Sequence, residues 1–446
     1  MIIFILKRNQ KHPAQILVLG FGSLILLGTF FFMLPIATYE EGRGLNFIDA
    51  LFEATSAVCV TGLAVVDTGT TFTLFGEIVL LCLIQIGGWG FMTTGTFMFI
   101  ILGKKIGLKE RLLLQDSLNV FSLSGVVNLV KRIILITFIV ELLGAIILAI
   151  NWSFEMPWKK AIYYGIFHSI SAFNNAGFGL EPDSLSKWVG DPTVNIVITL
   201  LFITGGIGFT VILDLFYKKS LCKLSLHSKV ALLMSLILNI VGFLVILSTE
   251  FNNPATIGNF PLGDKLWASY FQGVVPRTAG FNTIDITQMT TSSLVFMMAL
   301  MFIGASSGST GGGIKVTTYA IIIFAFWTVI SNRDDVNIFK RRISWRLVNK
   351  ALSIVVAAII FIFTIFFLLA YTEDADMSLI LFETISAFGT VGLSAGLTAD
   401  LSPVGRLLIT LMMFIGRLGP LTMAFALLNT RKEAKVRYAE EKILIG

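Results

Sequence analysis

The segment IDALFEATSAVCVTGL, residues Ile48–Leu63, recurs in altered form three more times along this 446-residue chain. The other copies are YYGIFHSISAFNNAGF at Tyr163–Phe178, LWASYFQGVVPRTAGF at Leu266–Phe281 and SLILFETISAFGTVGL at Ser378–Leu393. Aligned on their last glycines, the copies place in register Gly62, Gly177, Gly280 and Gly392, which lie 115, 103 and 112 residues apart. Such internal repetition predicts one structural unit used four times.

Each copy lies between two long apolar stretches. The stretches before the copies are Ile16–Ile36, Ile133–Ile150, Val230–Ser248 and Ala351–Tyr371, and those after them are Thr73–Leu102, Thr193–Tyr217, Leu294–Ile330 and Leu407–Leu428. A helix needs about 20 apolar residues to cross a bilayer, so each stretch is long enough for one span. The chain is also 55% hydrophobic and only 13% charged, too apolar for a soluble domain. The sequence predicts an all-α membrane protein: four tandem membrane–pore-helix–membrane repeats, with eight transmembrane helices and four re-entrant half-helices around a central pore.

A further glycine recurs inside each second apolar stretch. Gly87, Gly205, Gly304 and Gly416 lie 25, 28, 24 and 24 residues after the glycines that end the repeated segments. Close packing of membrane helices explains scattered glycines, but it does not explain several features in one fourfold register. We therefore divide the chain into repeat 1 (1–103), repeat 2 (104–218), repeat 3 (219–331) and repeat 4 with a C-terminal tail (332–446).

The basic residues predict the orientation in the membrane. Most of the 33 Lys and Arg residues lie in the N-terminal segment, in the connections between repeats and in the C-terminal tail. Because positive charge is retained on the cytoplasmic side, we expect a multi-pass protein of the cell membrane with both termini cytoplasmic. The short segments then enter from outside, where the acidic loop residues either concentrate cations or are ordinary solvated loop residues: Glu40, Glu41, Glu181, Asp183, Asp191, Glu373, Asp374 and Asp376.

The end of each short segment has the chemistry of a cation filter. A re-entrant half-helix directs the negative end of its dipole at a cation, and irregular backbone at this depth is tolerated only along a polar path. Glycine permits positive φ, so successive carbonyls can face one axis and replace the hydration shell of an ion. The predicted lining runs are Cys59-Val60-Thr61-Gly62, Asn174-Asn175-Ala176-Gly177, Arg277-Thr278-Ala279-Gly280 and Gly389-Thr390-Val391-Gly392.

Several side chains near these runs are predicted to support them. A guanidinium in a cation path would repel the cation, so Arg277 should turn away and pair with an acid or a carbonyl. Glu53, His168 and Glu383 each lie nine residues before their glycine. That spacing places them on the half-helices behind the filter, where they could anchor the loops by hydrogen bonds.

Repeat 3 departs from the others because glycines accumulate inside its second apolar stretch. Five glycines between Gly304 and Gly313 prevent a stable helix, since each costs about 0.8–1.0 kcal/mol relative to Ala. We expect a mobile loop that blocks the pore just inside the filter, with Arg417 at the same depth in repeat 4 as a hydrogen-bonded latch. Lys315 is either a second barrier or a side chain that reaches toward lipid. The predicted gating residues are Gly304, Ala305, Ser306, Ser307, Gly308, Ser309, Thr310, Gly311, Gly312, Gly313, Lys315 and Arg417.

These motifs resemble the Trk/Ktr/HKT superfamily of K⁺ transporters, and most closely the bacterial Ktr membrane subunit of the KtrB/KtrD type. The resemblance rests on the four filter glycines and on the run GASSGSTGGGIK at Gly304–Lys315, and it covers nearly the whole chain. It implies K⁺ uptake through a filter lined by these glycines and a gate formed by the loop. It also implies a homodimer with one pore per protomer, regulated by a separate cytoplasmic nucleotide-binding ring. The runs lack the full TVGYG of tetrameric K⁺ channels, so we expect less strict discrimination against Na⁺.

Other classes of function find less support. An alternating-access transporter is the main rival, although such folds mostly use inverted repeats of several full spans. The chain has no constellation expected of an enzyme, no nucleotide-binding motif and no cysteine or histidine cluster for a transition metal. Its net charge of +6 fits membrane topology and anionic lipid better than nucleic acid. The residues leave open whether Na⁺ is required and which nucleotide the partner senses.

Overall fold

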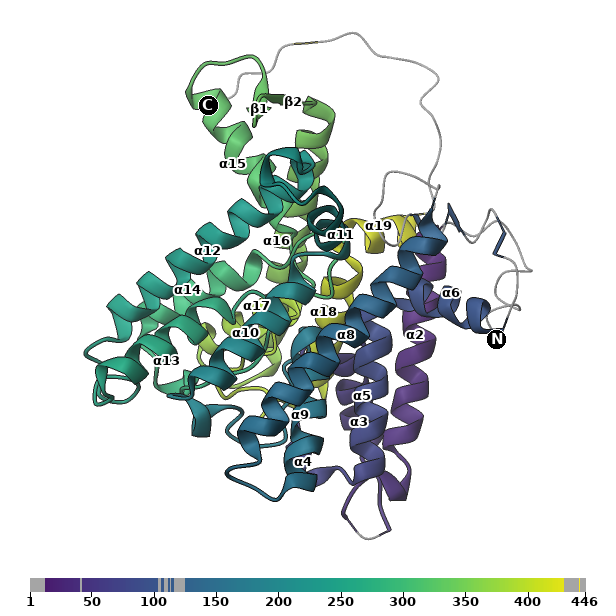
Figure 1. Ribbon diagram of the computed structural model, residues 1–446, viewed down its shortest axis with the longest axis vertical. Helices are drawn as coiled ribbons and strands as arrows, with labels where there is room; N and C mark the ends of the chain where they lie inside the picture. The colour runs from purple at the N-terminus through teal and green to yellow at the C-terminus, as the bar shows by residue number, and fades with distance from the viewer. Residues whose placement is uncertain are drawn as a thin grey trace.

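The computed structural model describes residues 13–40, 42–102, 106–107, 111–112, 114–115, 125–428 and 441. Over these residues the chain is mostly helical, with its long helices gathered in one body (Figure 1). The two chain ends, predicted to be cytoplasmic, and the predicted boundary between repeats 1 and 2 lie outside the described residues.

The first helix of every repeat is an unbroken span. Among the described residues these four helices are long and apolar enough to cross a membrane: α2 (Pro13–Phe32), α8 (Val126–Trp152), α12 (Leu226–Glu250) and α16 (Trp345–Thr372). Large apolar side chains such as Leu142, Leu244 and Phe363 are exposed along them. Lipid must cover these faces, because exposed apolar surface of this extent is not found on a soluble monomer.

A short helix packs against the first helix of each repeat, as predicted. These pore helices are α3 (Phe47–Cys59), α9 (Trp158–Phe173), α13 (Leu262–Val274) and α17 (Met377–Gly389). With 13 to 16 residues they are too short to cross a bilayer. Where the chain enters α3, the Asn46 side chain accepts a hydrogen bond of 3.0 Å from the Asp49 amide and caps the helix.

The second helix of each repeat is interrupted, as predicted in repeat 3, whereas in repeats 1, 2 and 4 the break corrects the continuous stretches expected from hydropathy. Three of them bend sharply: α5 (Leu74–Trp89) to α6 (Phe91–Ile101) by 103°, α10 (Pro192–Gly206) to α11 (Phe209–Lys218) by 97°, and α18 (Pro403–Leu418) to α19 (Pro420–Leu428) by 99°. At the bends Gly90, Gly208 and Gly419 have φ of 82°, 95° and 86°, a backbone conformation that ends a right-handed helix. In repeat 3 a loop separates α14 (Thr291–Phe302) from α15 (Val316–Ile330).

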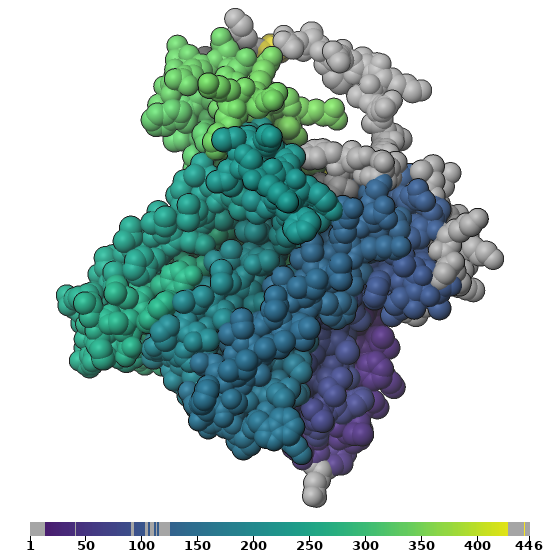
Figure 2. Space-filling model, in the orientation of Figure 1, coloured from purple at the N-terminus to yellow at the C-terminus, as the bar shows by residue number. Residues whose placement is uncertain are grey.

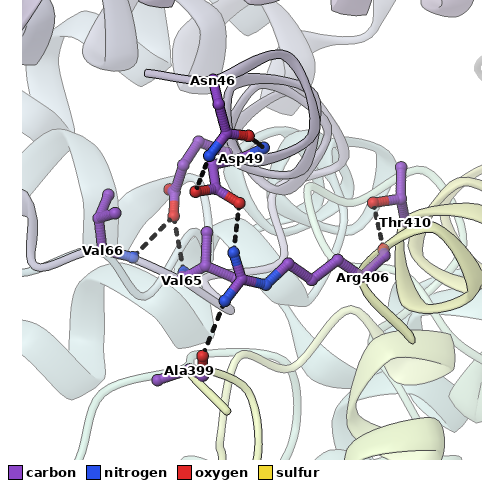
Figure 3. Close-up of polar contacts among 8 residues, drawn as sticks. Asn46, Asp49, Val65, Val66, Ala399, Arg406 and Thr410 are labelled. Carbon is purple, nitrogen blue, oxygen red and sulfur yellow. Dashed lines mark hydrogen bonds and ion pairs between the residues drawn. The ribbon is translucent and has the colours of Figure 1, made fainter. Parts of the chain in front are cut away.

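The four repeats close into a ring. The second helix of each repeat packs against the pore helix of the next: α5 on α9, α10 on α13 and α14 on α17. The ring closes where α18 packs on α3, and there Arg406 forms an ion pair with Asp49 and donates a hydrogen bond to the Ala399 carbonyl (Figure 3). The pore helices therefore surround one centre, and their side chains Phe52, Phe167, Phe271 and Phe388 are fully buried.

Smaller elements complete the described chain. They are the short helix α4 (Thr68–Thr71), the 3-10 turns η1 (Pro35–Ala37), η2 (Ser186–Trp188), η3 (Leu221–Lys223) and η4 (Ile286–Gln288), and the strands β1 (Val336–Ile338) and β2 (Arg341–Ile343). The two strands form an antiparallel hairpin in which Val336 pairs with Ile343. This hairpin lies beyond the end of α15, at the periphery of the molecule, as Figure 2 shows in green.

Candidate ion pathway

The four predicted filter runs meet at the centre of the ring. Each glycine abuts the run of another repeat: Gly62 touches Ala176 and Gly177, Gly177 touches Ala279 and Gly280, Gly280 touches Val391, and Gly392 touches Thr61 and Gly62. A Cβ atom built on Gly177 would lie 2.6 Å from the Gly280 Cα atom, closer than real Cβ contacts come. No side chain fits at these positions, so the backbones alone line the centre.

The backbone of every run follows the same pattern. The glycine has positive φ in each case: 93° at Gly62, 72° at Gly177, 77° at Gly280 and 89° at Gly392. The residue two places earlier also has positive φ, although it carries a side chain: 57° at Val60, 60° at Asn175, 74° at Thr278 and 49° at Thr390. The left-handed conformation costs such a residue about 1–2 kcal/mol, so its fourfold recurrence indicates strain kept at a functional site.

The pore helices end where the runs begin. Cys59 and Gly389, predicted as the first residues of their runs, are the last residues of α3 and α17, while Asn174 caps α9. The four helix C-termini thus converge on the centre, and their partial negative charge favours a cation there.

A vestibule opens above the filter glycines. Its volume is about 290 Å³, and its lining includes all four glycines together with Asp67, Glu181 and Asp285. Glu181 was singled out from the sequence, whereas Asp67 and Asp285 were not. Partial burial favours the neutral form of Glu181, but hydrogen bonds from Lys187 and Tyr164 outweigh it and lower the pKa of this carboxyl. The vestibule therefore presents negative charge to arriving cations.

Two of the three predicted anchors hold the chain beyond the filter. Glu53 accepts hydrogen bonds from the Val65 and Val66 amides at 2.7 and 3.3 Å. Glu383 accepts from the hydroxyls of Ser394 and Thr398. A buried carboxyl group with such partners fixes the loop that follows its pore helix.

His168 and Arg277 behave differently from each other. His168 Nδ1 pairs with the carbonyl of Tyr164 on its own helix, 2.9 Å away. Contrary to the prediction, this contact does not anchor a loop. Arg277 turns away from the centre, as predicted, and donates to Asn239 Oδ1 at 2.9 Å and to the Ser235 carbonyl and hydroxyl at 3.2 and 3.1 Å. The two acceptor residues, Ser235 and Asn239, lie on α12, and neither is an acid.

The glycine-rich stretch of repeat 3 is irregular, as predicted, and lies directly under the filter. Its Thr310 hydroxyl donates to Asn175 Oδ1 at 2.8 Å, and its Gly312 amide donates to the Thr390 hydroxyl at 3.1 Å. The amides of Ser306 and Thr310 donate to the last carbonyls of α10, at Gly206 and Gly205. The loop is thus docked on side chains of two filter runs and on the end of a neighbouring helix.

Two cationic side chains hold this loop. Arg417 donates one hydrogen bond to the Thr310 carbonyl and another to the Gly87 carbonyl of α5. Lys315 Nζ donates to the Gly311 carbonyl at 2.6 Å, so it folds back onto the loop rather than toward lipid. The contact predicted between Arg417 and a loop carbonyl is present.

One polar cluster escaped the sequence reasoning. Glu141 lies near the middle of α8, and Gln85 lies on α5, two residues before Gly87. Both accept a hydrogen bond from Asn174, the first residue of the second filter run. The available signal was the carboxylate itself, because an ionisable residue inside an apolar span is functional by default.

The comparisons with known proteins agree with this architecture. Residues 6–434 match the family of cation transport proteins called TrkH. The chain belongs to this family. It is 48% identical to the Ktr system potassium uptake protein B of Bacillus subtilis over 99% of this chain and 98% of that protein. It is 38% identical to the potassium/sodium uptake protein NtpJ of Enterococcus hirae over 98% of both chains.

A solved structure of this family has the same fold. The potassium transporter TrkH from Vibrio parahaemolyticus superposes with a TM-score of 0.74 at 20% identity, over 94% of this chain and 86% of that chain. The assignment confirms the resemblance drawn from the filter glycines and the loop, the multi-pass membrane architecture, and the class of transport protein rather than enzyme.

Proposed function

We propose that this TrkH-family member takes up K⁺ through the four filter runs, as the ion-translocating subunit of a Ktr-type system. The observation that carries the proposal is the fourfold backbone pattern, in which each run pairs two left-handed residues at one shared centre. Such a pattern allows successive carbonyls to face one axis, which is what a dehydrated cation requires. The names of relatives in Bacillus subtilis and Vibrio alginolyticus, both Ktr system potassium uptake proteins, support K⁺ as the cargo.

In this mechanism K⁺ collects in the acidic vestibule and exchanges water for filter carbonyls. Beneath the filter, residues 304–315 occlude the path, and Arg417 holds them by bridging the Thr310 carbonyl to α5. Lys315 adds a second positive charge at the same level, bound to Gly311. Opening requires the loop to leave its contacts with the filter threonine and asparagine side chains.

Regulation, in this proposal, comes from another polypeptide. The sequence contains no nucleotide-binding motif, so a cytoplasmic nucleotide-binding ring would dock on the basic face that the connections between repeats 1–103, 104–218, 219–331 and 332–446 provide. The protein would act as a homodimer with one pore per protomer and both termini cytoplasmic. The shared name "Ktr system" of the relatives supports a multi-component assembly.

Flux through purified protein tests the proposed function. We expect liposomes containing the chain to accumulate ⁸⁶Rb⁺ down a K⁺ gradient, with currents that reverse at the K⁺ potential. Strict coupling of every ion to a second solute would instead favour the alternating-access rival. Repeating the flux with and without Na⁺ tests whether uptake depends on Na⁺.

Nucleotide binding tests the proposed division of labour. Equilibrium dialysis of the purified chain against radiolabelled ATP or ADP should show no stoichiometric binding. Tight binding at one nucleotide per chain would place the sensor in this subunit and contradict the proposed ring.

A further inference from the structure

The amide of Asn174 occupies an unusual position behind the second filter run. Its Nδ2 atom lies 3.0 Å from Glu141 Oε1, 3.1 Å from Gln85 Oε1 and 2.9 Å from the Ile170 carbonyl. An amide nitrogen has two hydrogens and cannot serve three acceptors fully. Its Oδ1 atom, at the other end, is buried against Gly88 and has no hydrogen-bond partner in the described part of the chain. Three oxygens therefore surround one point that carries only partial positive charge.

The charge at this point is also unbalanced. Glu141 is 5% exposed and Asn174 is fully buried. Among the described residues Glu141 has no Lys, Arg or His partner, unlike Asp49 with Arg406. A carboxylate in an apolar interior needs an ion pair or several hydrogen bonds, and without them a bound cation or a proton must neutralise it.

We propose that Glu141, Gln85 and Asn174 form a Na⁺ site outside the conduction path. The ligands would be the Glu141 carboxylate, the two amide oxygens and the Ile170 carbonyl, and oxygen donors of this kind suit hard cations. One carboxylate among neutral oxygens balances a monovalent ion, whereas a divalent ion would leave excess charge. The name of the Enterococcus hirae relative, a potassium/sodium uptake protein, agrees with a role for Na⁺.

The site has two states that differ by a rotation of one amide. With Nδ2 turned inward, as in the structure, Asn174 bridges the oxygens itself. With the ion bound, Oδ1 turns inward as a ligand, and Nδ2 turns toward Gly88 and leaves its three acceptors to the ion. Because Asn174 begins a filter run and Gln85 lies two residues from Gly87, the acceptor of Arg417, the ion would act on both filter and gate.

Thermal unfolding of the full chain in detergent tests binding directly. The midpoint would be measured against NaCl concentration, with choline chloride keeping ionic strength constant and K⁺ fixed at a level that saturates the filter. We expect a saturable, Na⁺-specific rise in the midpoint. Glu141→Gln keeps the shape of the side chain without its charge and should weaken the apparent Na⁺ affinity at least tenfold.

Two further variants keep the test decisive. Gln85→Met removes one ligand oxygen and should also weaken the response, which covers the case in which Glu141→Gln does not fold. Glu250→Gln is the matched control, because Glu250 is also buried but already accepts hydrogen bonds from Thr256, Thr290 and Ser293. Its Na⁺ response should be intact.

Three results would overturn the site. They are a wild-type midpoint that does not distinguish Na⁺ from choline, a Na⁺ response unchanged in both site variants, and a midpoint that follows pH through Glu141 and ignores Na⁺. The last result would mean that the carboxyl holds a proton.

The effect of this ion on transport rests on the proposed function. In liposomes, Na⁺ should raise ⁸⁶Rb⁺ uptake by the wild type and by Glu250→Gln, and the ratio of uptake with to uptake without Na⁺ should fall to one in Glu141→Gln. An uptake ratio that stays above one in Glu141→Gln would show that Na⁺ does not act on transport through this site. Absence of uptake in every protein, with Na⁺ binding intact, would contradict the proposed function and leave the site standing.

Discussion

The repeats are alike in the outer half of the molecule, which carries the pore helices and filter runs, and differ in the inner half, which carries the bends and the loop. In the outer half the four repeats are alike: each has a pore helix, a run with two left-handed residues and a glycine against the next run. In the inner half they diverge. Repeats 1, 2 and 4 turn by about 100° at one glycine, whereas repeat 3 opens into a loop between α14 and α15.

The difference separates two tasks. A cage that surrounds an ion needs equivalent contributions from all sides, so the sequence variation among the runs leaves their backbone unchanged. A plug needs only one element to enter the path, so one repeat supplies the loop and its neighbours supply the contacts that hold it. Arg417 in repeat 4 lies at the depth where the loop of repeat 3 begins, and it binds that loop.

The largest effect should come from breaking the equivalence of the outer half. Replacing Gly62, Gly177, Gly280 or Gly392 by Ser adds a side chain where none fits and where the backbone is left-handed. The backbone strain costs about 1–2 kcal/mol and the added atoms about 1–3 kcal/mol, so K⁺ affinity should fall by at least about one order of magnitude in ⁸⁶Rb⁺ uptake. Aspartate at the same positions should also disturb K⁺/Na⁺ preference. A glycine whose replacement leaves affinity and preference intact does not line the path.

Removing the element unique to the inner half should act in the opposite direction. Deletion of residues 306–311 eliminates the loop contacts with Asn175 and the carbonyl held by Arg417. Flux in regulator-free liposomes should rise. The K⁺/Na⁺ selectivity should not change, because the filter sets it. Deleting the peripheral hairpin, residues 336–343, is the control and should leave flux unchanged. Equal or lower flux in a well-inserted loop deletion would return the loop to a packing role.

A smaller increase is expected when only the latch is removed. Arg417→Ala abolishes charge-assisted hydrogen bonds worth roughly 1.5–3 kcal/mol, enough to shift a two-state gate by one to two decades. Arg417→Lys keeps the charge but cannot bridge the Thr310 and Gly87 carbonyls as a guanidinium does, so its flux should lie between those of Ala and wild type. Wild-type flux in Arg417→Ala would show that the loop is held without this residue.

The smallest effect concerns the seam where the ring of repeats closes. Asp49 on α3 and Arg406 on α18 form an ion pair with side chains 13% and 21% exposed. A double-mutant cycle with Asp49→Asn and Arg406→Gln should give a coupling of about 1 kcal/mol in thermal unfolding. Filter selectivity should not change. Zero coupling would show that helix packing alone closes the ring.

Much of this architecture could be predicted from the sequence. Hydropathy found the first helix of each repeat, because an apolar run of sufficient length has few alternatives in a membrane. The register of the repeated segments found the pore helices and the glycines that meet at the centre. The five glycines among Ser and Thr predicted the irregular loop, since each glycine lowers the stability of a helix.

What escaped prediction depends on three-dimensional neighbours. Gly90, Gly208 and Gly419 break helices that hydropathy presents as continuous, and an isolated glycine does not reveal whether its φ will be positive. His168 has the same spacing as Glu53 and Glu383, but its Nδ1 atom pairs with its own helix and its Nε2 atom has no hydrogen-bond partner among the described residues. The partners of Asn174 lie 33 and 89 residues away on two different helices, beyond any local pattern.

The sharp bends also set the thickness of membrane that this protein fits. At 1.5 Å per residue, α8 and α16, of 27 and 28 residues, are about 40 and 42 Å long, while α5 and α10, of 16 and 15 residues, reach only about 24 and 22 Å before they turn. Leu74, Ile78, Ile196 and Leu200 are exposed on these short helices. The protein thus presents two hydrophobic lengths around its perimeter to a hydrocarbon core of about 30 Å. Beside α5 and α10 either the bilayer thins, or flanking side chains and neighbouring chains make up the difference, so acyl-chain length becomes a variable that acts on these two sides first.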